Sequence, residues 1–443
     1  MKSLLSRYIV TSDPVYGYIK IYDHEVSILE SEAFQRLRRI KHLGVTDYAY
    51  PGATYTTFLH SIGTAHIVEN MVREVLVKAD VSYDDIERYV VLLRLILLLH
   101  DVGYGPYTYV FEEAILEPRQ LTHEGMGARI AEEFSEISVG IEKALRDYGY
   151  TYKHVIQAIN SRNIDNWPFR SQINSEINEK VLFHFFKGAF SANTIDRVLR
   201  DSYYTGAIRS VIDWRKLLYY TLPYEDGVVF DSRATDILEQ ILITKMRLLL
   251  HVYYDSEVRS TSIFCRNVLK KLDQEKLIDF DAIVRDVYRY LTLDDYTIFS
   301  IENVRYVKEV KSFTYGRNPY VACIEYYVPR EKYFKTDIDI NEIKRIVVER
   351  IRDCGTEIDV DSDLFIDVLN HLMKLIFKER EYEISTRYGD GSIVKTKIYD
   401  FLPTLFNCKV VAFRVYVKRT LSDKVCNMRY KIISSIDNEI GVY

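Results

Sequence analysis

The sequence predicts a mainly α-helical protein with a smaller α+β region at its C-terminal end. Residues 30–300 place apolar side chains at helical spacing, whereas several segments beyond residue 300 are rich in β-branched and aromatic residues that partly alternate with polar ones. The chain has 443 residues, more than one compact core usually contains. We therefore expect a helical core over residues 1–300 and an α+β region over residues 301–443.

The first region is expected to contain several consecutive helices. Residues 90–99 form the longest apolar run, but this run is half the roughly 20 residues that a membrane span requires, and it contains Arg94. It therefore predicts a buried core helix and no membrane association. The segments with helical spacing or helix start signals cover residues 32–44, 61–80, 84–100, 122–134 and 236–255.

The second region mixes strand and helix signals. Strands are expected within residues 318–329, 391–401 and 408–420, where β-branched and aromatic side chains dominate. Residues 361–381 have helical spacing and predict a helix between two of these strands.

The charge balance limits the possible partners. The chain carries 59 basic and 64 acidic side chains, a formal net charge of −5. This balance argues against nonspecific nucleic-acid binding, although a local basic pocket can still hold phosphate groups. The N-terminal residues do not resemble a signal peptide, so a cytoplasmic location is expected.

The cysteines are odd in number, far apart and never in a C-x-x-C pair. This pattern predicts free thiols in a reducing cytosol. The five residues are Cys265, Cys323, Cys354, Cys408 and Cys426.

The histidines gather in the N-terminal part of the chain, where seven of the ten precede residue 155. Among them, His100 and Asp101 stand at the end of a predicted core helix. Imidazoles with carboxylates suit a divalent cation that keeps water in its open positions and neutralises phosphate charge. In the alternative interpretation, Asp101 only caps the turn before Gly103, since a single histidine is more often a structural residue than a ligand.

Four motifs occur in a fixed order, and together they resemble the HD-domain phosphohydrolases. The resemblance is to the branch of deoxynucleoside triphosphate triphosphohydrolases that includes the mammalian sterile-alpha-motif HD enzyme. It covers about residues 8–265 and implies an HD-domain helical core. The motifs are the segment 34–72 with "FLHSIG", "LLHDVGYGPYTYVFE" at 98–112, "THEG" at 122–125 and "IDRVLRDSYYTG" at 195–206.

The resemblance implies a site for a divalent metal ion, with Fe, Mn, Mg and Zn as the candidates. His60, His100 and Asp101 match three of the family's four ligands, but the fourth, an aspartate in the family, is Asn193 here. An amide oxygen can coordinate a cation but contributes no charge, so weaker binding is expected. Asp196, one turn later, could replace it only if the helix were rotated.

The residues that handle protons are only partly retained. His123 and Glu112 match a family histidine and its acidic partner, a pair suited to general base catalysis. Tyr104 and Tyr109 replace two family histidines. A phenol is a poor base at neutral pH, so we expect Tyr109 to act at most as a slow acid or a hydrogen-bond donor.

The residues expected to contact the substrate are also altered. A family arginine of the phosphate clamp is Thr57 here, and His42 replaces a glutamine beside the sugar. Arginines elsewhere could restore the positive charge, or they could be ordinary surface residues. The substrate-binding candidates are His42, Leu43, Arg197, Asp201, Arg247 and Tyr254.

Gln35 and Arg38 match positions that read an activating guanine nucleotide in the mammalian relative. Helix packing is the alternative interpretation of this pair, which shares a helix face.

The sequence thus predicts a metal-dependent HD-domain phosphohydrolase that acts on (deoxy)nucleotide phosphates or another phosphate ester. The alternative is a catalytically degenerate HD-domain protein that binds a nucleotide or serves as a regulator or scaffold. The family resemblance also implies a homo-oligomer, a dimer or a tetramer.

Overall fold

The computed structural model confirms the mainly helical fold. It describes residues 4–209, 211–329, 339–353, 355–360, 362–368, 383–398 and 409–440. The chain forms two compact units that interleave along the sequence, so a single division at residue 300 does not describe them. Unit 1 comprises Met1–Tyr253, Cys265–Lys311 and Ile384–Lys395, and unit 2 comprises Tyr254–Phe264, Ser312–Glu383 and Thr396–Tyr443.

The helices fall mostly in unit 1, and helix α13 has residues in both units. In chain order the helices are α1 (Asp23–Leu29), α2 (Glu32–Arg36), α3 (Thr57–Leu76), α4 (Tyr83–Leu99), α5 (Tyr109–Phe111), α6 (His123–Glu133), α7 (Ser135–Leu145), α8 (Tyr152–Asn160), α9 (Val181–Lys187), α10 (Ala192–Thr205), α11 (Trp214–Tyr219), α12 (Thr235–Leu248), α13 (Ser256–Gln274), α14 (Phe280–Arg285), α15 (Val287–Leu291), α16 (Lys308–Thr314), α18 (Ile340–Asp353), α22 (Ser422–Asn427) and α23 (Arg429–Ile440).

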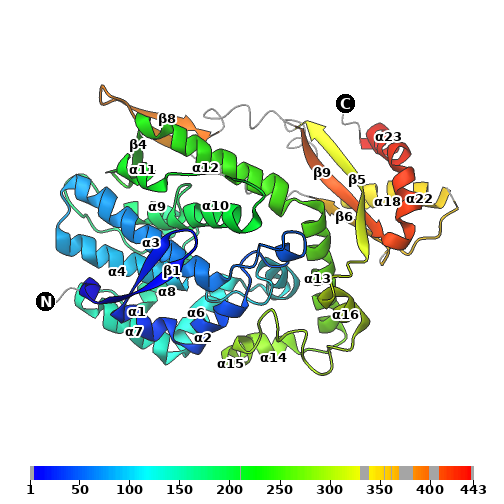
Figure 1. Ribbon diagram of the computed structural model, residues 1–443, viewed down its shortest axis with the longest axis horizontal. Coiled ribbons are helices and arrows are strands. Elements are labelled where there is room, and N and C mark those ends of the chain that lie inside the picture. Colours follow the sequence, from blue (N-terminus) through cyan, green and yellow to red (C-terminus); the bar gives the residue numbers. More distant parts are fainter. Residues whose placement is uncertain are drawn as a thin grey trace. The chain divides into compact units, whose positions relative to one another are not determined.

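Helix α4 is the central element of unit 1. All of its residues from Tyr89 to Leu99 are buried, as expected for a core helix that is apolar on every face. Helix α3 packs along it, and α10 packs on α3 (Figure 1). The one charged residue of the run, Arg94, is paired with Glu25 at 2.6 Å and Glu69 at 3.1 Å. Among the described helices, none is long and apolar enough to cross a membrane.

Two small sheets complete unit 1. Strands β1 (Tyr8–Asp13) and β2 (Gly17–Tyr22) form an antiparallel hairpin. The second sheet has the order β3-β4-β7-β8, with β3 at Thr221–Tyr224, β4 at Gly227–Asp231, β7 at Glu383–Arg387 and β8 at Ile393–Lys397. Because β7 pairs with β4 in parallel, a late segment of the chain joins the helical unit.

The helix predicted over residues 32–44 is shorter than expected. Helix α2 and a 3-10 turn end at Arg39, and Ile40 is extended. The reason is tertiary pairing, since Lys41 forms a β-bridge with Thr56 and its backbone NH donates to Asp295. The residues that follow, including His42, therefore lie in a loop.

Unit 2 contains a three-stranded antiparallel sheet in the order β5-β9-β6. The strands predicted near residues 320 and 410 are confirmed as β5 (Tyr320–Pro329) and β9 (Lys409–Lys418). The helix predicted over residues 361–381 is wrong at its start, where β6 (Leu364–Val368) pairs with β9, and its remainder lies outside the described residues. Pairing with β9 at the edge of the sheet outweighs the helical spacing of residues 364–368.

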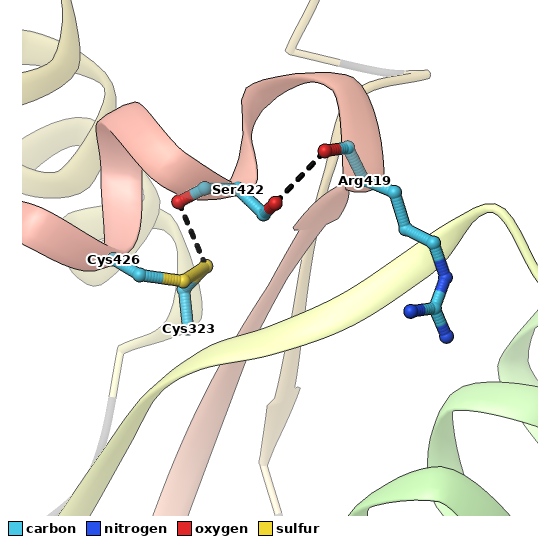
Figure 2. Close-up of a disulfide and its surroundings, with 4 residues drawn as sticks. All are labelled: Cys323, Arg419, Ser422 and Cys426. Carbon is cyan, nitrogen blue, oxygen red and sulfur yellow. Dashed lines mark hydrogen bonds between the residues drawn. A yellow bond between two sulfur atoms is a disulfide. The ribbon is translucent and has the colours of Figure 1, made fainter.

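The prediction of free cysteines is wrong for one pair. Cys323 on β5 and Cys426 on α22 form a disulfide, beside which the hydroxyl of Ser422 donates to the carbonyl oxygen of Arg419 (Figure 2). The two cysteines are 103 residues apart in sequence, so only the fold of unit 2 brings them together. Cys265 is a buried free thiol, and the remaining two cysteines lie outside the described residues.

Candidate metal centre

The His100–Asp101 corner lies where α4 ends, and both residues are buried. A Cβ added to Gly103 would lie 2.0 Å from the carbonyl oxygen of His123 and 2.3 Å from the backbone nitrogen of Gly127. Only glycine therefore allows α6 to pack so closely against the turn. This packing brings His123 beside the corner.

Two histidine rings are fixed through Nδ1 and present Nε2 to Asp101. His60 Nδ1 lies 2.7 Å from a carboxylate oxygen of Asp196, and His100 Nδ1 lies 2.7 Å from the carbonyl oxygen of Leu97. Both acceptors favour a proton on Nδ1, so in the neutral form of each ring the lone pair is on Nε2. The Nε2 atoms of His60 and His100 lie 3.6 and 3.2 Å from Asp101 Oδ2. Both are buried without a hydrogen-bond partner in the described part of the chain.

A third imidazole, that of His42, joins this cluster. Its Nδ1 lies 4.0 Å from Asp101 Oδ2, and its ring centre lies 4.1 Å from that of His60. The nitrogen is buried and has no hydrogen-bond partner among the residues described. Burial and the neighbouring His60 lower the pKa of His42 well below its usual range, so the ring is neutral. The sequence placed His42 beside a sugar and did not indicate this position.

Asn193, the predicted fourth ligand, lies in the first turn of α10. The side-chain oxygen of Asn193 is buried and unpaired within the described ranges. Asp196 follows three residues later, and residues at this spacing share a helix face. Because Asp196 reaches His60, Asn193 is expected on the same side of α10.

Asp196 supports the cluster from behind and is not available as the substitute ligand. It accepts hydrogen bonds from His60, from the hydroxyl of Tyr16 at 2.7 Å and from Arg200 at 3.0 Å. Arg200 also pairs with Asp13 at 2.9 Å, so the β1–β2 hairpin is tied to α10. The sequence could have indicated the Asp196–Arg200 pair by its spacing of one helical turn. It gave no sign of the residues of the β1–β2 hairpin that contact this pair.

Asp101 is held in its ionised form by this environment. Burial opposes the charge, but His100, His60 and His42 outweigh this effect and hold the pKa of the Asp101 carboxyl well below its usual range. The cluster therefore presents one carboxylate and several imidazole nitrogens, all buried, and the amide oxygen of Asn193 is expected on the same side. Such a donor set fits a divalent transition-metal ion.

The predicted proton-handling pair is formed. His123 Nδ1 lies 2.9 Å from both carboxylate oxygens of Glu112, and its Nε2 lies 3.8 Å from Asp101 Oδ1. Burial opposes protonation, but Glu112 and Glu124 raise the pKa of His123 above its ordinary value. The ring of Tyr104 stacks on that of His123 with centres 4.0 Å apart.

Tyr109 begins α5, next to the loop that carries His42. A Cβ added to Gly44 would lie 3.2 Å from a ring carbon of Tyr109. The structure thus places this tyrosine against residue 44, and its role as an acid stays a prediction.

Asp201 lies at the centre of a second polar group. The hydroxyls of Tyr55 and Tyr253 donate to its two carboxylate oxygens. Burial raises the pKa of Asp201, although Arg197 and both tyrosines oppose this effect. Leu43 packs with Tyr55 in the adjoining apolar cluster, against which Tyr253 also lies. Two tyrosines from separate segments therefore meet at Asp201, and neither was expected from the sequence.

Two further substrate candidates come later in the chain. Arg247 is exposed near the end of α12, and Tyr254 belongs to unit 2, where its carbonyl oxygen accepts from Arg414. Thr57 is fully buried. Arg38 donates to Gln35 at 2.8 Å, which agrees with the helix-packing interpretation of this pair.

Several of the candidate metal-binding residues lie in the part of the chain that is similar to a known family. Residues 57–166 match the family model of the HD domain, and His60, His100, Asp101 and His123 fall within this range. The chain resembles the HD domain over these residues. Its resemblance to the HD-domain phosphohydrolases, in the branch of dNTP triphosphohydrolases, is confirmed by the relatives as well.

Three known proteins show what this chain is similar to. It is 29% identical to the uncharacterized protein YwfO of Bacillus subtilis over 299 residues, which are 66% of this chain and 64% of YwfO, less than two thirds of that relative. It is 23% identical to the deoxynucleoside triphosphate triphosphohydrolase SAMHD1 homolog of Dictyostelium discoideum over 394 residues, 86% of this chain and 70% of the relative. A phosphohydrolase of Bacteroides thetaiotaomicron shares the fold with a TM-score of 0.67 at 18% identity, covering 93% of this chain and 100% of that one.

Proposed function

We propose that this HD-domain protein is a metal-dependent phosphohydrolase that acts on nucleotide phosphates. The observation that carries the proposal is the convergence of unpaired, buried donor atoms from His60 and His100 on the ionised Asp101. Leaving buried polar atoms unpaired costs about 1–3 kcal/mol each, and a ligand that binds them removes this cost. Asn193 would complete the set. A bound divalent cation would supply an activated water and neutralise phosphate charge.

His123 and Glu112 are the proton-handling residues of the proposed reaction. Because Glu112 occupies Nδ1, the Nε2 atom of His123 faces the Asp101 side of the site, where it can hold or release a proton. The stacked ring of Tyr104 keeps the imidazole in this orientation. The neutral phenol does not itself replace a histidine base, because burial raises its pKa well above the usual range.

Arg197 supports a phosphate-bearing substrate. It is exposed on α10, one turn after Asn193, and interacts electrostatically with Asp201 and Tyr253. A guanidinium at this position can bind phosphate oxygens in the absence of the clamp arginine replaced by Thr57. A nucleotide is the preferred substrate class because the Dictyostelium relative is named as a dNTP triphosphohydrolase.

The test combines metal analysis with a substrate panel. The purified protein is expected to contain Fe, Mn or Zn and to release phosphate or triphosphate from at least one of the dNTPs, NTPs or monophosphates tested. His100→Ala should abolish both properties. His24→Gln is the matched control, since His24 is also largely buried with unpaired ring nitrogens but lies on α1. Absence of metal and of product across the panel would rule out the enzyme.

A binding protein without catalysis is the second candidate. It is favoured by the uncharged Asn193 and by Asp201, whose two oxygens are already occupied by tyrosine hydroxyls. In that case nucleotides should raise the melting temperature of the metal-loaded protein without being consumed.

Assembly into a homo-oligomer is also proposed, from the family resemblance alone, together with a cytoplasmic location. Light scattering of the purified protein tests the first, and fractionation of the source cells tests the second.

A further inference from the structure

We propose that His42 is a direct ligand of the metal ion, through Nδ1, and offsets the weak donor at position 193. This inference rests on the metal centre of the proposed function. It changes the role of His42 from a substrate contact to part of the metal site.

Distances support a shared cation. Two donors bound to one ion at bonds of about 2.0–2.1 Å cannot lie more than about 4.2 Å apart. The distances from Asp101 Oδ2 to His42 Nδ1, His60 Nε2 and His100 Nε2 are 4.0, 3.6 and 3.2 Å, all within this limit. The donor atoms of His42, His60 and Asp101 all lie within 4.8 Å of one another. His100 is not part of this group, so an ion shared by all four residues would require their side chains to rotate toward it.

The backbone of His42 is held on both sides. Its NH donates to the carbonyl oxygen of Tyr55 at 3.0 Å, and its carbonyl oxygen accepts from Thr108 Oγ1 at 3.3 Å. The preceding NH, of Lys41, donates to Asp295 at 2.8 Å. The loop is therefore fixed before any ion binds, which is the arrangement of a preformed ligand.

The surroundings of the ring leave Nδ1 directed at the cluster. The ring packs on those of His60, Tyr55 and Tyr104. Its Nδ1 is nevertheless buried without a hydrogen-bond partner in the part of the chain that the structure describes. An imidazole nitrogen that is buried, unpaired and next to a carboxylate and two further imidazoles has the chemistry of a ligand.

The proposal predicts the kind of metal. Three imidazoles with one carboxylate favour a late transition metal such as Zn²⁺, Co²⁺ or Fe²⁺ over Mg²⁺, which prefers oxygen donors. His60 and His100 already favour such a metal, and a third imidazole from His42 would strengthen the preference.

The experiment uses Co²⁺ alone, without substrate, on the full-length metal-free protein. Binding is followed by calorimetry and by the visible absorption of the bound ion, which reports its ligands. Loss of an outer-sphere partner of a metal site costs 10–100-fold in affinity, so His42→Gln should weaken Co²⁺ binding by roughly 100-fold and change the spectrum. His24→Gln should change neither.

A second variant separates ligation from packing. In His42→Asn the amide oxygen stands the same number of bonds from Cβ as Nδ1, so it should bind Co²⁺ more tightly than His42→Gln. Thermal melts of the metal-free variants show whether each folds, and His42→Asn remains informative if His42→Gln does not.

A double-mutant cycle with Asn193→Asp tests whether His42 offsets the weak donor at position 193. Because the new carboxylate restores a strong donor, the loss caused by His42→Gln should be smaller in the Asn193→Asp background. Equal Co²⁺ affinity and spectra for His42→Gln and His24→Gln would overturn the proposal, as would a native protein that binds no Co²⁺. A native protein that binds Co²⁺ through His42 but hydrolyses nothing would instead refute only the proposed function.

Discussion

The Tyr104 ring shows how a single residue changes the chemistry of this site. It stacks on His123 with an interplanar angle of 10° and meets His42 edge to face. The family resemblance implies a histidine at this position. Tyr104 therefore replaces an imidazole with a phenol ring that packs against the rings of His123 and His42. The proton chemistry that remains is concentrated in His123 and Glu112.

The effect of Glu112 on the protonation of His123 can be tested by substitution. Because its negative charge stabilises the protonated His123 ring, Glu112→Gln should lower the pKa of His123. Burial alone would then dominate, and it favours the neutral ring. An NMR titration of the metal-free protein measures the change, and His154, on α8, is the internal control. An unchanged His123 pKa would show that Glu124 and Asp101 are sufficient.

At the scale of elements, the site depends on the contact between α6 and the turn after α4. Gly103→Ala should lower the free energy of unfolding by about 1–3 kcal/mol, because the added methyl would overlap the backbone of α6. It should also move His123, the proposed proton-handling residue, away from Asp101. Gly389→Ala is the control, since a Cβ there meets nothing within 4 Å. Urea denaturation measures both variants, and equal stabilities would contradict the prediction.

The loops that carry His42 and Tyr107 are joined by a single buried carboxyl. Asp295 accepts from the backbone NH groups of Lys41 at 2.8 Å and Tyr107 at 2.6 Å. Tyr107 and Thr108 both have positive φ, 56° and 49°, so the second loop is strained without this support. Burial raises the pKa of Asp295 to about 7.

This raised pKa predicts a pH-dependent stability. Between about pH 4 and pH 7 the unfolded carboxyl ionises while the folded one keeps its proton, so folding stability falls as pH rises, by about 4 kcal/mol in total. Asp295→Asn should remove this fall, and its stability relative to the native protein should rise from pH 4 to pH 8. Asp294→Asn should act in the opposite sense, because Arg39 outweighs burial and lowers the pKa of Asp294. Parallel stability–pH curves for all three proteins would contradict the assignment.

At the scale of the whole molecule, unit 2 is closed by the disulfide between Cys323 and Cys426. A cross-link that spans about 100 residues stabilises a fold by about 4–5 kcal/mol, through the smaller entropy of the unfolded chain. Reduction should therefore lower the urea midpoint of the native protein. The Cys323→Ser variant should show this lower midpoint with or without reductant. If reductant changes nothing in the native protein, the disulfide does not contribute to stability.

The sequence by itself determined the helical core and identified most residues of the candidate metal centre. Apolar spacing identified α3, α4 and α6, because burial of one face dictates a local pattern that survives in any context. The motifs identified His60, His100 and His123 because each stands at a fixed place on or just after one of these helices. These features are local, so they can be read from consecutive residues.

Only the tertiary structure decided which distant residues meet. His42 reaches the cluster because helix α2 gives way to a loop that pairs with Thr56 and Asp295, partners far from it in sequence. Residues 364–368 became a strand, and Cys323 found Cys426, for the same reason. Pairing energies between remote segments override local spacing, and no consecutive pattern encodes them.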